Sequence, residues 1–358
     1  MKNNGVFITL YDEETLNLYL YKGIYGFLMK PVYEQVSSCS NHYKALADYG
    51  CLREGSHVFF FLKREIVYGG QIIGNISDGS FYINGPYSPL GRESNSDIYW
   101  DESKRQRYVK TCKEGIFKID EEEKCQPFIV KFKDDNNLKG KYISSDELYF
   151  ELGKYPYPLP SNAIQNMGFC ILTPGETHIA IELLMNSSNK KIINCNEHIE
   201  LNDDIVLYNN TFGVQSLKED NILSESHLEF SLLSNSKLLS KLIKLPNNYT
   251  LSRQVPISPF KPNQMDRADI CIYDIKEPIR DGTLPNIIIE LKKDKANYKA
   301  IEQVTRYLRW LEMIIDDDKI FKNIKAYIVS AGITRGTEEL LKNCKYSDMI
   351  EIFNYKSV

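Results

Sequence analysis

The segment NIIIELK, residues 286–292, constrains the fold more than any other part of the chain. Its nearly continuous apolar run is typical of a strand that is buried on both faces. The alternating segment ADICIYD precedes it at 268–274 and predicts a neighbouring strand. Residues 297–317 follow with the period of an amphipathic helix. This part of the chain is therefore expected to pack helices against a sheet.

The remaining segments of this part complete an alternating order of helices and strands. A helix is predicted to start near 224–226, where Ser226 and Glu229 have the spacing of a capping box. A strand is expected over 325–332, then a short helix, and a last strand in MIEIFNY. The expected order is helix, two strands, helix, strand, helix, strand, which indicates an α/β sandwich.

The length of 358 residues favours two domains. Residues 1–185 contain short β-rich runs separated by turns, such as the one at 55–76, and predict a mostly-β domain. Residues 186–223 are rich in Asn, Ser, Asp and Lys and are interpreted as a linker. Residues 224–358 form the second domain. The predicted fold class is thus α/β (α+β) with two domains, and a fragment from about residue 220 is expected to fold alone.

Charge and composition narrow the possible functions. Residues 221–358 carry 21 Lys and Arg against 18 Asp and Glu, a net charge of +3, which leaves 23 against 30, a net charge of −7, for 1–220. A mildly basic second half suits a phosphate backbone. The eight cysteines are scattered singly, so a structural zinc site is not expected. The absence of a long apolar run or a signal-peptide pattern predicts a soluble, cytoplasmic protein without membrane contact.

Three residues are candidates for a catalytic site. Glu290 and Lys292 lie two positions apart in a strand, so their side chains leave the same face. Their neighbours are apolar, and a buried carboxylate and ammonium need partners. Asp269, at the start of the preceding strand, could supply a second carboxylate.

Two close carboxylates repel each other unless a cation lies between them. Mg²⁺, with Mn²⁺ as an alternative, takes such oxygen ligands, and the backbone carbonyl of Leu291 is a further expected ligand. Lys292 would then orient or deprotonate a metal-bound water, or balance charge on a phosphate. The competing interpretation is that these residues form ordinary surface ion pairs, because an E-x-K spacing is common.

Residues 224–355 resemble the C-terminal nuclease domain of NucS-like endonucleases, within the PD-(D/E)XK superfamily. The similar segments are SESHLEFSLLSNSKLL, MDRADICIYD, NIIIELKKDKANYKAIEQVTRYLRWL and KAYIVSAGITRGTEELL. The resemblance implies a restriction-endonuclease-like α/β sandwich. It also implies catalytic roles for Asp269, Glu290 and Lys292, with Gln303 and Tyr307 lining the site. Glu225 matches an acidic residue of the first helix that joins the metal ligands.

Four basic residues are candidates for contacts with nucleic acid. Arg306 and Arg309 flank Tyr307 on the predicted helix, and phosphate contacts are commonly made by such side chains. Lys293 and Arg267 lie next to the candidate catalytic residues in the sequence.

The first half resembles the PUA-related EVE and YTH-like barrels, in the segments YLYKGIYGFLMKP, GSHVFFFLKREIVYGGQIIG and ISSDELYFELGKYPYPLPSNAIQNMGF. That resemblance implies a PUA-like barrel that binds modified bases. Tyr25, Tyr99 and Trp100 are candidates for stacking on such a base, although aromatic residues more often pack in a core.

The sequence thus predicts a Mg²⁺-dependent endonuclease that cuts DNA, expected to be double-stranded, with a recognition domain in front. A restriction or defence role against foreign DNA follows from this combination. The alternatives are a catalytically silent nucleic-acid-binding module of a larger complex, and a nuclease acting on RNA or branched DNA, because fold alone does not decide the substrate. Cutting both strands with one site per chain would favour a homodimer.

Overall fold

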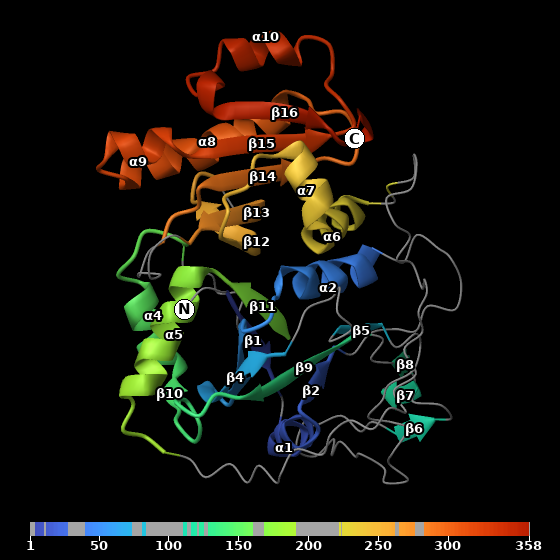
Figure 1. The fold of residues 1–358 in the computed structure, drawn as a ribbon, viewed down its shortest axis with the longest axis vertical. Helices are drawn as coiled ribbons and strands as arrows, with labels where there is room; N and C mark the ends of the chain where they lie inside the picture. The colour runs from blue at the N-terminus through green and yellow to red at the C-terminus, as the bar shows by residue number, and fades with distance from the viewer. Residues whose placement is uncertain are drawn as a thin grey trace.

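A computed structural model gives the arrangement of the chain (Figure 1). It describes residues 4–10, 12–27, 40–73, 81–83, 110–112, 116–119, 122–124, 128–159, 168–190, 222, 224–261, 265–275 and 283–357. Most of the predicted linker lies outside these residues. Within the described part of the chain, no helix is both long and apolar enough to cross a membrane.

The first half is built on a mixed sheet with the strand order β11-β1-β3-β4-β9-β2. β10 pairs with β4, β5 pairs with β9, and β6, β7 and β8 form a separate small sheet. The strands are β1 (Gly5–Thr9), β2 (Ile24–Gly26), β3 (His57–Leu62), β4 (Glu65–Ile72), β5 (Phe81–Ile83), β6 (Lys110–Cys112), β7 (Ile116–Ile119), β8 (Glu122–Lys124), β9 (Phe128–Asp134), β10 (Ile143–Ser144) and β11 (Phe169–Leu172). The helices are α1 (Glu13–Lys22), α2 (Ser40–Cys51), α4 (Ser145–Leu152) and α5 (Pro174–Asn186).

The two end strands of the main sheet approach each other through their side chains. Tyr25 of β2 stacks on Phe169 of β11, with ring centroids 5.6 Å apart. The Tyr25 hydroxyl also donates to the carbonyl oxygen of Gly168 at 3.5 Å. The sheet therefore curves around an aromatic core, as expected for a half that the sequence predicted to be mostly β.

The second half contains a five-stranded sheet in the order β12-β13-β14-β15-β16. The first two pairings are antiparallel, and the last two are parallel. Its strands are β12 (Tyr249–Ser258), β13 (Asp266–Asp274), β14 (Ile287–Leu291), β15 (Lys325–Ser330) and β16 (Ile350–Asn354). Its helices are α6 (Glu225–Ser234), α7 (Ser236–Leu242), α8 (Tyr298–Ile314), α9 (Asp318–Lys322) and α10 (Thr337–Lys342), with 3-10 turns at Ser347–Met349 and Tyr355–Ser357.

β14 has apolar side chains on both faces because helices cover the sheet on both sides (Figure 1). Ile287, Ile289 and Leu291 join one core, which also includes Leu228 of α6. Ile288 joins a second core with apolar residues of α8. The α/β sandwich expected from the sequence is therefore present, with the predicted order of elements extended by β12 in front of β13 and by the short α7 and α9.

The capping box predicted for the first helix of this half is wrong. α6 begins at Glu225, and the side chain of its N-cap Ser224 accepts a hydrogen bond from the backbone N–H of His227 at 3.2 Å. Glu229 lies a full turn inside the helix and is only 3% exposed. Its carboxylate is bound by Arg253 instead, as described below.

The two halves share their apolar cores. One continuous cluster runs from residues of β1 and α2 through α6 to β14. α2 packs along α6 (Figure 1), and Tyr43 of α2 stacks on His227 with ring centroids 4.2 Å apart. Tyr157 of the first half belongs to the core beneath α8, where its hydroxyl lies 2.7 Å from that of Tyr273. The packing of the second half is thus completed by side chains that precede residue 186.

This shared packing changes the expectation for an isolated second half. A fragment of residues 224–358 would lose Tyr157 from one core and expose the face of α6 that α2 covers. We expect it to unfold without a cooperative transition, because it lacks part of its buried apolar surface. Urea unfolding followed by near-ultraviolet circular dichroism would measure this. A sharp transition like that of the full chain would contradict the expectation.

Candidate active site

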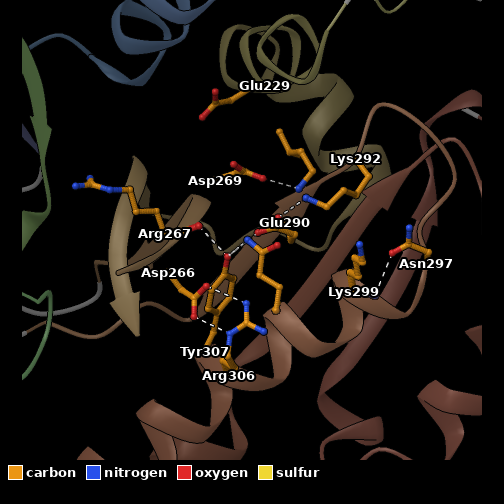
Figure 2. Close-up of polar contacts among 12 residues, drawn as sticks. Glu229, Asp266, Arg267, Asp269, Glu290, Lys292, Asn297, Lys299, Arg306 and Tyr307 are labelled. Atoms are coloured by element: carbon orange, nitrogen blue, oxygen red, sulfur yellow. Dashed lines mark hydrogen bonds and ion pairs between the residues drawn. The ribbon is translucent and has the colours of Figure 1, made fainter. Parts of the chain in front are cut away.

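Glu290 lies where β14 ends and faces α8. Its side chain is 2% exposed, and both carboxylate oxygens are engaged (Figure 2). The ammonium of Lys292 donates to Oε1 at 2.6 Å, and the hydroxyl of Tyr307 donates to Oε2 at 2.8 Å. The ion pair shows that the side chains of Glu290 and Lys292 leave the same face of the chain, as predicted.

Asp269 lies on the neighbouring strand β13, and its carboxylate is held from two sides. The backbone N–H of Leu291 donates to Oδ2 at 2.7 Å. The side-chain amide of Gln254 donates to Oδ1 at 2.9 Å. The structure therefore brings Asp269 next to the end of β14, as the sequence predicted. Gln254 was missed, because β12 itself was not predicted.

Tyr307 and Gln303 of α8 extend the site on the side of Glu290. Tyr307 is fully buried, and its hydroxyl lies 2.7 Å from the carbonyl oxygen of Arg267 as well as close to Glu290. The amide of Gln303, one turn earlier, donates to the Tyr307 hydroxyl at 2.6 Å. The two residues thus meet at the site, where they orient Glu290 through hydrogen bonds.

α6 brings two acidic residues to the opposite side of Asp269. Glu229 forms a bidentate ion pair with Arg253 of β12, at 2.9 and 2.6 Å. Glu225 is exposed, yet its charge is near enough to act on the pKa values of Glu290 and Lys292. Among the described residues, no three His, Cys, Asp or Glu side chains converge on a metal-sized site. Glu225 is therefore not brought together with Asp269 and Glu290 as a third side-chain ligand.

The charges of the site fit a bound cation. Burial, together with the charges of Glu290 and Glu229, raises the pKa of Asp269 well above its usual range. Burial also raises the pKa of Glu290, although Lys292 opposes this. Burial acts to lower the pKa of Lys292, but the carboxylates of Glu290, Asp269 and Glu225 together outweigh burial and raise that pKa. Two desolvated carboxylates thus share one nearby ammonium, and a hard divalent cation would relieve their repulsion. The oxygens of Asp269 and Glu290 and the carbonyl of Leu291 are the donors that could hold it.

A cavity of about 620 Å³ opens beside these residues, between the two halves of the chain. Asp269, Leu291 and Gln254 line it from the second half. Tyr149, Tyr155 and Glu176 line it from the first half, together with the start of α5. The cavity between the two halves therefore borders the candidate site at Asp269 and Leu291.

A comparison with protein families covers most of the second half of the chain. Residues 271–349 match the model of the endonuclease NucS C-terminal domain. The second half of the chain contains a NucS-like domain. The match includes Glu290, Lys292, Gln303 and Tyr307 and begins two residues after Asp269.

Two solved structures share a part of their length with the chain. A repair endonuclease from Pyrococcus abyssi is 21% identical, over 37% of this chain and 47% of that one, with a TM-score of 0.24. The EndoMS–dsDNA2 complex is 15% identical, over 38% of this chain and 48% of that one, with a TM-score of 0.25. The aligned region thus spans about half the length of each solved structure. No significant match was found among the curated proteins.

The four basic candidates for DNA contact have different surroundings in the NucS-like domain. Arg306 forms a bidentate ion pair with the buried Asp266, at 2.7 and 2.9 Å, which favours a role in bracing α8 against β13. Arg267 donates to the carbonyl oxygen of Gln254 at 3.0 Å and lines the cavity. Arg309 is exposed and lies over the ring of Phe260, and Lys293 is exposed just beyond β14. Arg267, Arg309 and Lys293 therefore remain the better placed candidates.

Of the aromatic residues proposed for base recognition, the structure describes Tyr25 alone. Tyr25 is 5% exposed and packs between Tyr19, Phe60 and Phe169, so its ring faces are already covered by neighbouring side chains. This favours a packing role for Tyr25. Tyr99 and Trp100 lie outside the described residues. Within the described part of the first half, Tyr149, Tyr155 and Tyr157 border the cavity.

Proposed function

We propose that this protein is a metal-dependent endonuclease that hydrolyses phosphodiester bonds of DNA. The observation that carries the proposal is the cluster of Asp269, Glu290 and Lys292, held by Tyr307 and Leu291 inside a NucS-like domain. Phosphodiester hydrolysis needs a positioned water and positive charge near the phosphate. The cluster offers both kinds of group, because it combines two carboxylates with an ammonium, and its Asp269 lines the cavity.

The residues of the cluster have separate roles in this proposal. Asp269, Glu290 and the carbonyl of Leu291 would hold Mg²⁺ or Mn²⁺, which would supply a polarised water and stabilise negative charge on the phosphate. Tyr307 and Gln303 hold Glu290 in orientation through the contacts already described. The side chain of Lys292 is 28% exposed, so its ammonium can face the substrate phosphate as well as Glu290.

Cleavage is expected to require Mg²⁺ or Mn²⁺ and to stop when a chelator is added. Ca²⁺ should support DNA binding with little turnover, because it accepts looser coordination and positions a water less well. The test is a cleavage assay of the full chain on plain, methylated, hydroxymethylated, single-stranded and RNA substrates, with each ion in turn. Cleavage that persists in chelator would contradict the metal mechanism, and preference for RNA would contradict the proposed substrate.

We further propose that the first half selects the DNA, with a PUA-like fold and a modified base as its target. The support is the aromatic lining that this half contributes to the cavity beside Asp269, through Tyr149 and Tyr155. A cytoplasmic restriction or defence enzyme would need such selectivity to spare its own DNA. Two copies acting together would allow both strands to be cut. Unequal cleavage of modified and plain duplexes in the same assay would support selection by the first half.

A further inference from the structure

Gln254 has a backbone conformation that residues other than glycine rarely adopt. Its φ of 51° lies in the left-handed region, although it stands in the middle of β12. Arg253 pairs with Ile270 and Val255 with Ala268, so Gln254 stands opposite Asp269 in the ladder. Such strain persists only where the surroundings hold it in place, and it is often found at functional sites.

The side chain of Gln254 contacts the site that the proposed function uses. Its amide donates to Oδ1 of Asp269 at 2.9 Å and lies 3.5 Å from Oε1 of Glu229. Its backbone carbonyl oxygen accepts from Arg267 at 3.0 Å. The backbone N–H of Leu291 donates to the other oxygen, Oδ2. The two hydrogen bonds together fix the plane of the Asp269 carboxylate.

The first half of the chain anchors the residue next to Gln254. Arg253 forms ion pairs with Asp48 of α2, at 2.5 Å, and with Glu229 of α6, at 2.6 Å. Its side chain is 9% exposed, so both pairs are largely shielded from water. α2 lies directly against α6 at this interface (Figure 1). The position of β12 at Gln254 therefore depends on a carboxylate that belongs to the first half.

We propose that Gln254 is a positioning residue that orients Asp269 for the divalent cation, and that Asp48 of the first half holds Gln254 in place through Arg253. The inference rests on the proposed function, because it concerns the same metal site. It makes the first half a structural part of that site, in addition to any role in selecting DNA.

The decisive variant is Gln254→Gly in the full chain. Glycine adopts a positive φ without strain, so the melting temperature should stay equal or rise. The loss of the amide should weaken Mn²⁺ binding about 10- to 100-fold, as is typical when a residue that orients a metal ligand is removed. Mn²⁺ titrated without DNA, followed by calorimetry or by the electron paramagnetic resonance signal of free Mn²⁺, measures the affinity. An unchanged Mn²⁺ affinity would overturn the proposal.

Gln71→Gly is the matched control. Gln71 also donates its amide to a carboxylate, that of Asp135 at 3.1 Å, but in β4 of the first half. We expect the reverse pattern, a lower melting temperature with unchanged Mn²⁺ affinity, because glycine weakens a strand interior. An equal loss of Mn²⁺ affinity in this control would overturn the proposal, since the effect would then not be specific to Gln254.

Asp48→Ala tests the link to the first half. We expect a weaker Mn²⁺ affinity, and no further loss when it is combined with Gln254→Gly, because both act through the same residue. Unchanged affinity in Asp48→Ala, or fully additive losses, would overturn the link. Failure of the unaltered protein to bind Mn²⁺ and cut DNA would overturn the proposed function, and this inference with it. Normal cleavage and normal affinity in Gln254→Gly would overturn this inference alone.

Discussion

Glu290→Gln and Lys292→Met are each expected to lower the rate of DNA cleavage by about 10²- to 10⁴-fold, the range that positioned acid–base groups contribute. Gln keeps the shape of Glu290 and its contact with Tyr307 but removes the charge that would hold a cation. Met keeps the apolar stem of Lys292 but removes the ammonium that lies 2.6 Å from Glu290. Single-turnover cleavage with saturating enzyme would measure the chemical step without the contribution of binding.

The matched control for Lys292→Met is Lys322→Met. Lys322 also lies in the second half and forms an ion pair, with Asp318 of α9 at 3.9 Å, but its side chain is 74% exposed. Its replacement should leave the cleavage rate unchanged, and all three variants should keep the melting temperature within a few degrees. A cleavage rate close to that of the unaltered protein in Glu290→Gln or Lys292→Met would show that the active site lies elsewhere.

Arg253→Met is expected to lower the free energy of unfolding by about 3–5 kcal/mol at neutral pH, the cost of leaving a buried ion-pair partner uncompensated. Arg253 is bound by two carboxylates at once, those of Asp48 and Glu229. Glu229 is 3% exposed and cannot recover its lost partner from water. Urea unfolding of the full chain measures the effect. Arg64→Met is the control, because the Arg64–Asp146 pair is 74% and 77% exposed and should contribute less than about 1 kcal/mol.

The loss of stability in Arg253→Met should also depend on pH. Burial raises the pKa of Asp48 to about 6, while Arg253 lowers it. Without Arg253 the pKa of Asp48 would rise further, so the folded state would bind a proton more readily than the unfolded state. A raised folded pKa means that stability is gained as the pH falls through that pKa. The difference between variant and unaltered protein should therefore shrink between pH 8 and pH 5. A difference that stays constant with pH would contradict this origin.

The sequence alone predicted the elements whose periodicity was strong. β13, β14 and α8 were expected close to their observed bounds, because apolar alternation, a continuous apolar run and a helical period are local signals. Asp269, Glu290 and Lys292 followed from their places on those strands. Tyr307 and Gln303 followed from the resemblance and from their spacing on one helical face. The structure places Tyr307 against Glu290 and Gln303 against Tyr307.

β12 was missed because its pattern is interrupted. Leu251, Val255 and Ile257 alternate and are buried, but Arg253 and Pro256 stand among them. The spacing of those three apolar residues was the available signal. Gln254 and Arg253 were therefore missed as well, since their roles depend on Asp48 and Glu229, which are distant in sequence. The N-cap of α6 is Ser224, two residues before the predicted one, and Glu229 binds Arg253, a partner that is also distant in sequence.

The apolar nature of β14 has a consequence for strand pairing. If a strand slips by one residue along its neighbour, every side chain moves to the opposite face of the sheet. In a strand with one apolar face, that slip would expose the apolar side chains, so the correct register is favoured. Ile287, Ile288, Ile289 and Leu291 would be buried in either register, so they discriminate weakly. Glu290 discriminates strongly, because the shifted register would bury its carboxylate among apolar side chains and away from Tyr307. The residue proposed to hold the cation thus also specifies how its own strand pairs, and an apolar residue at position 290 would remove this discrimination, whereas Gln would keep it.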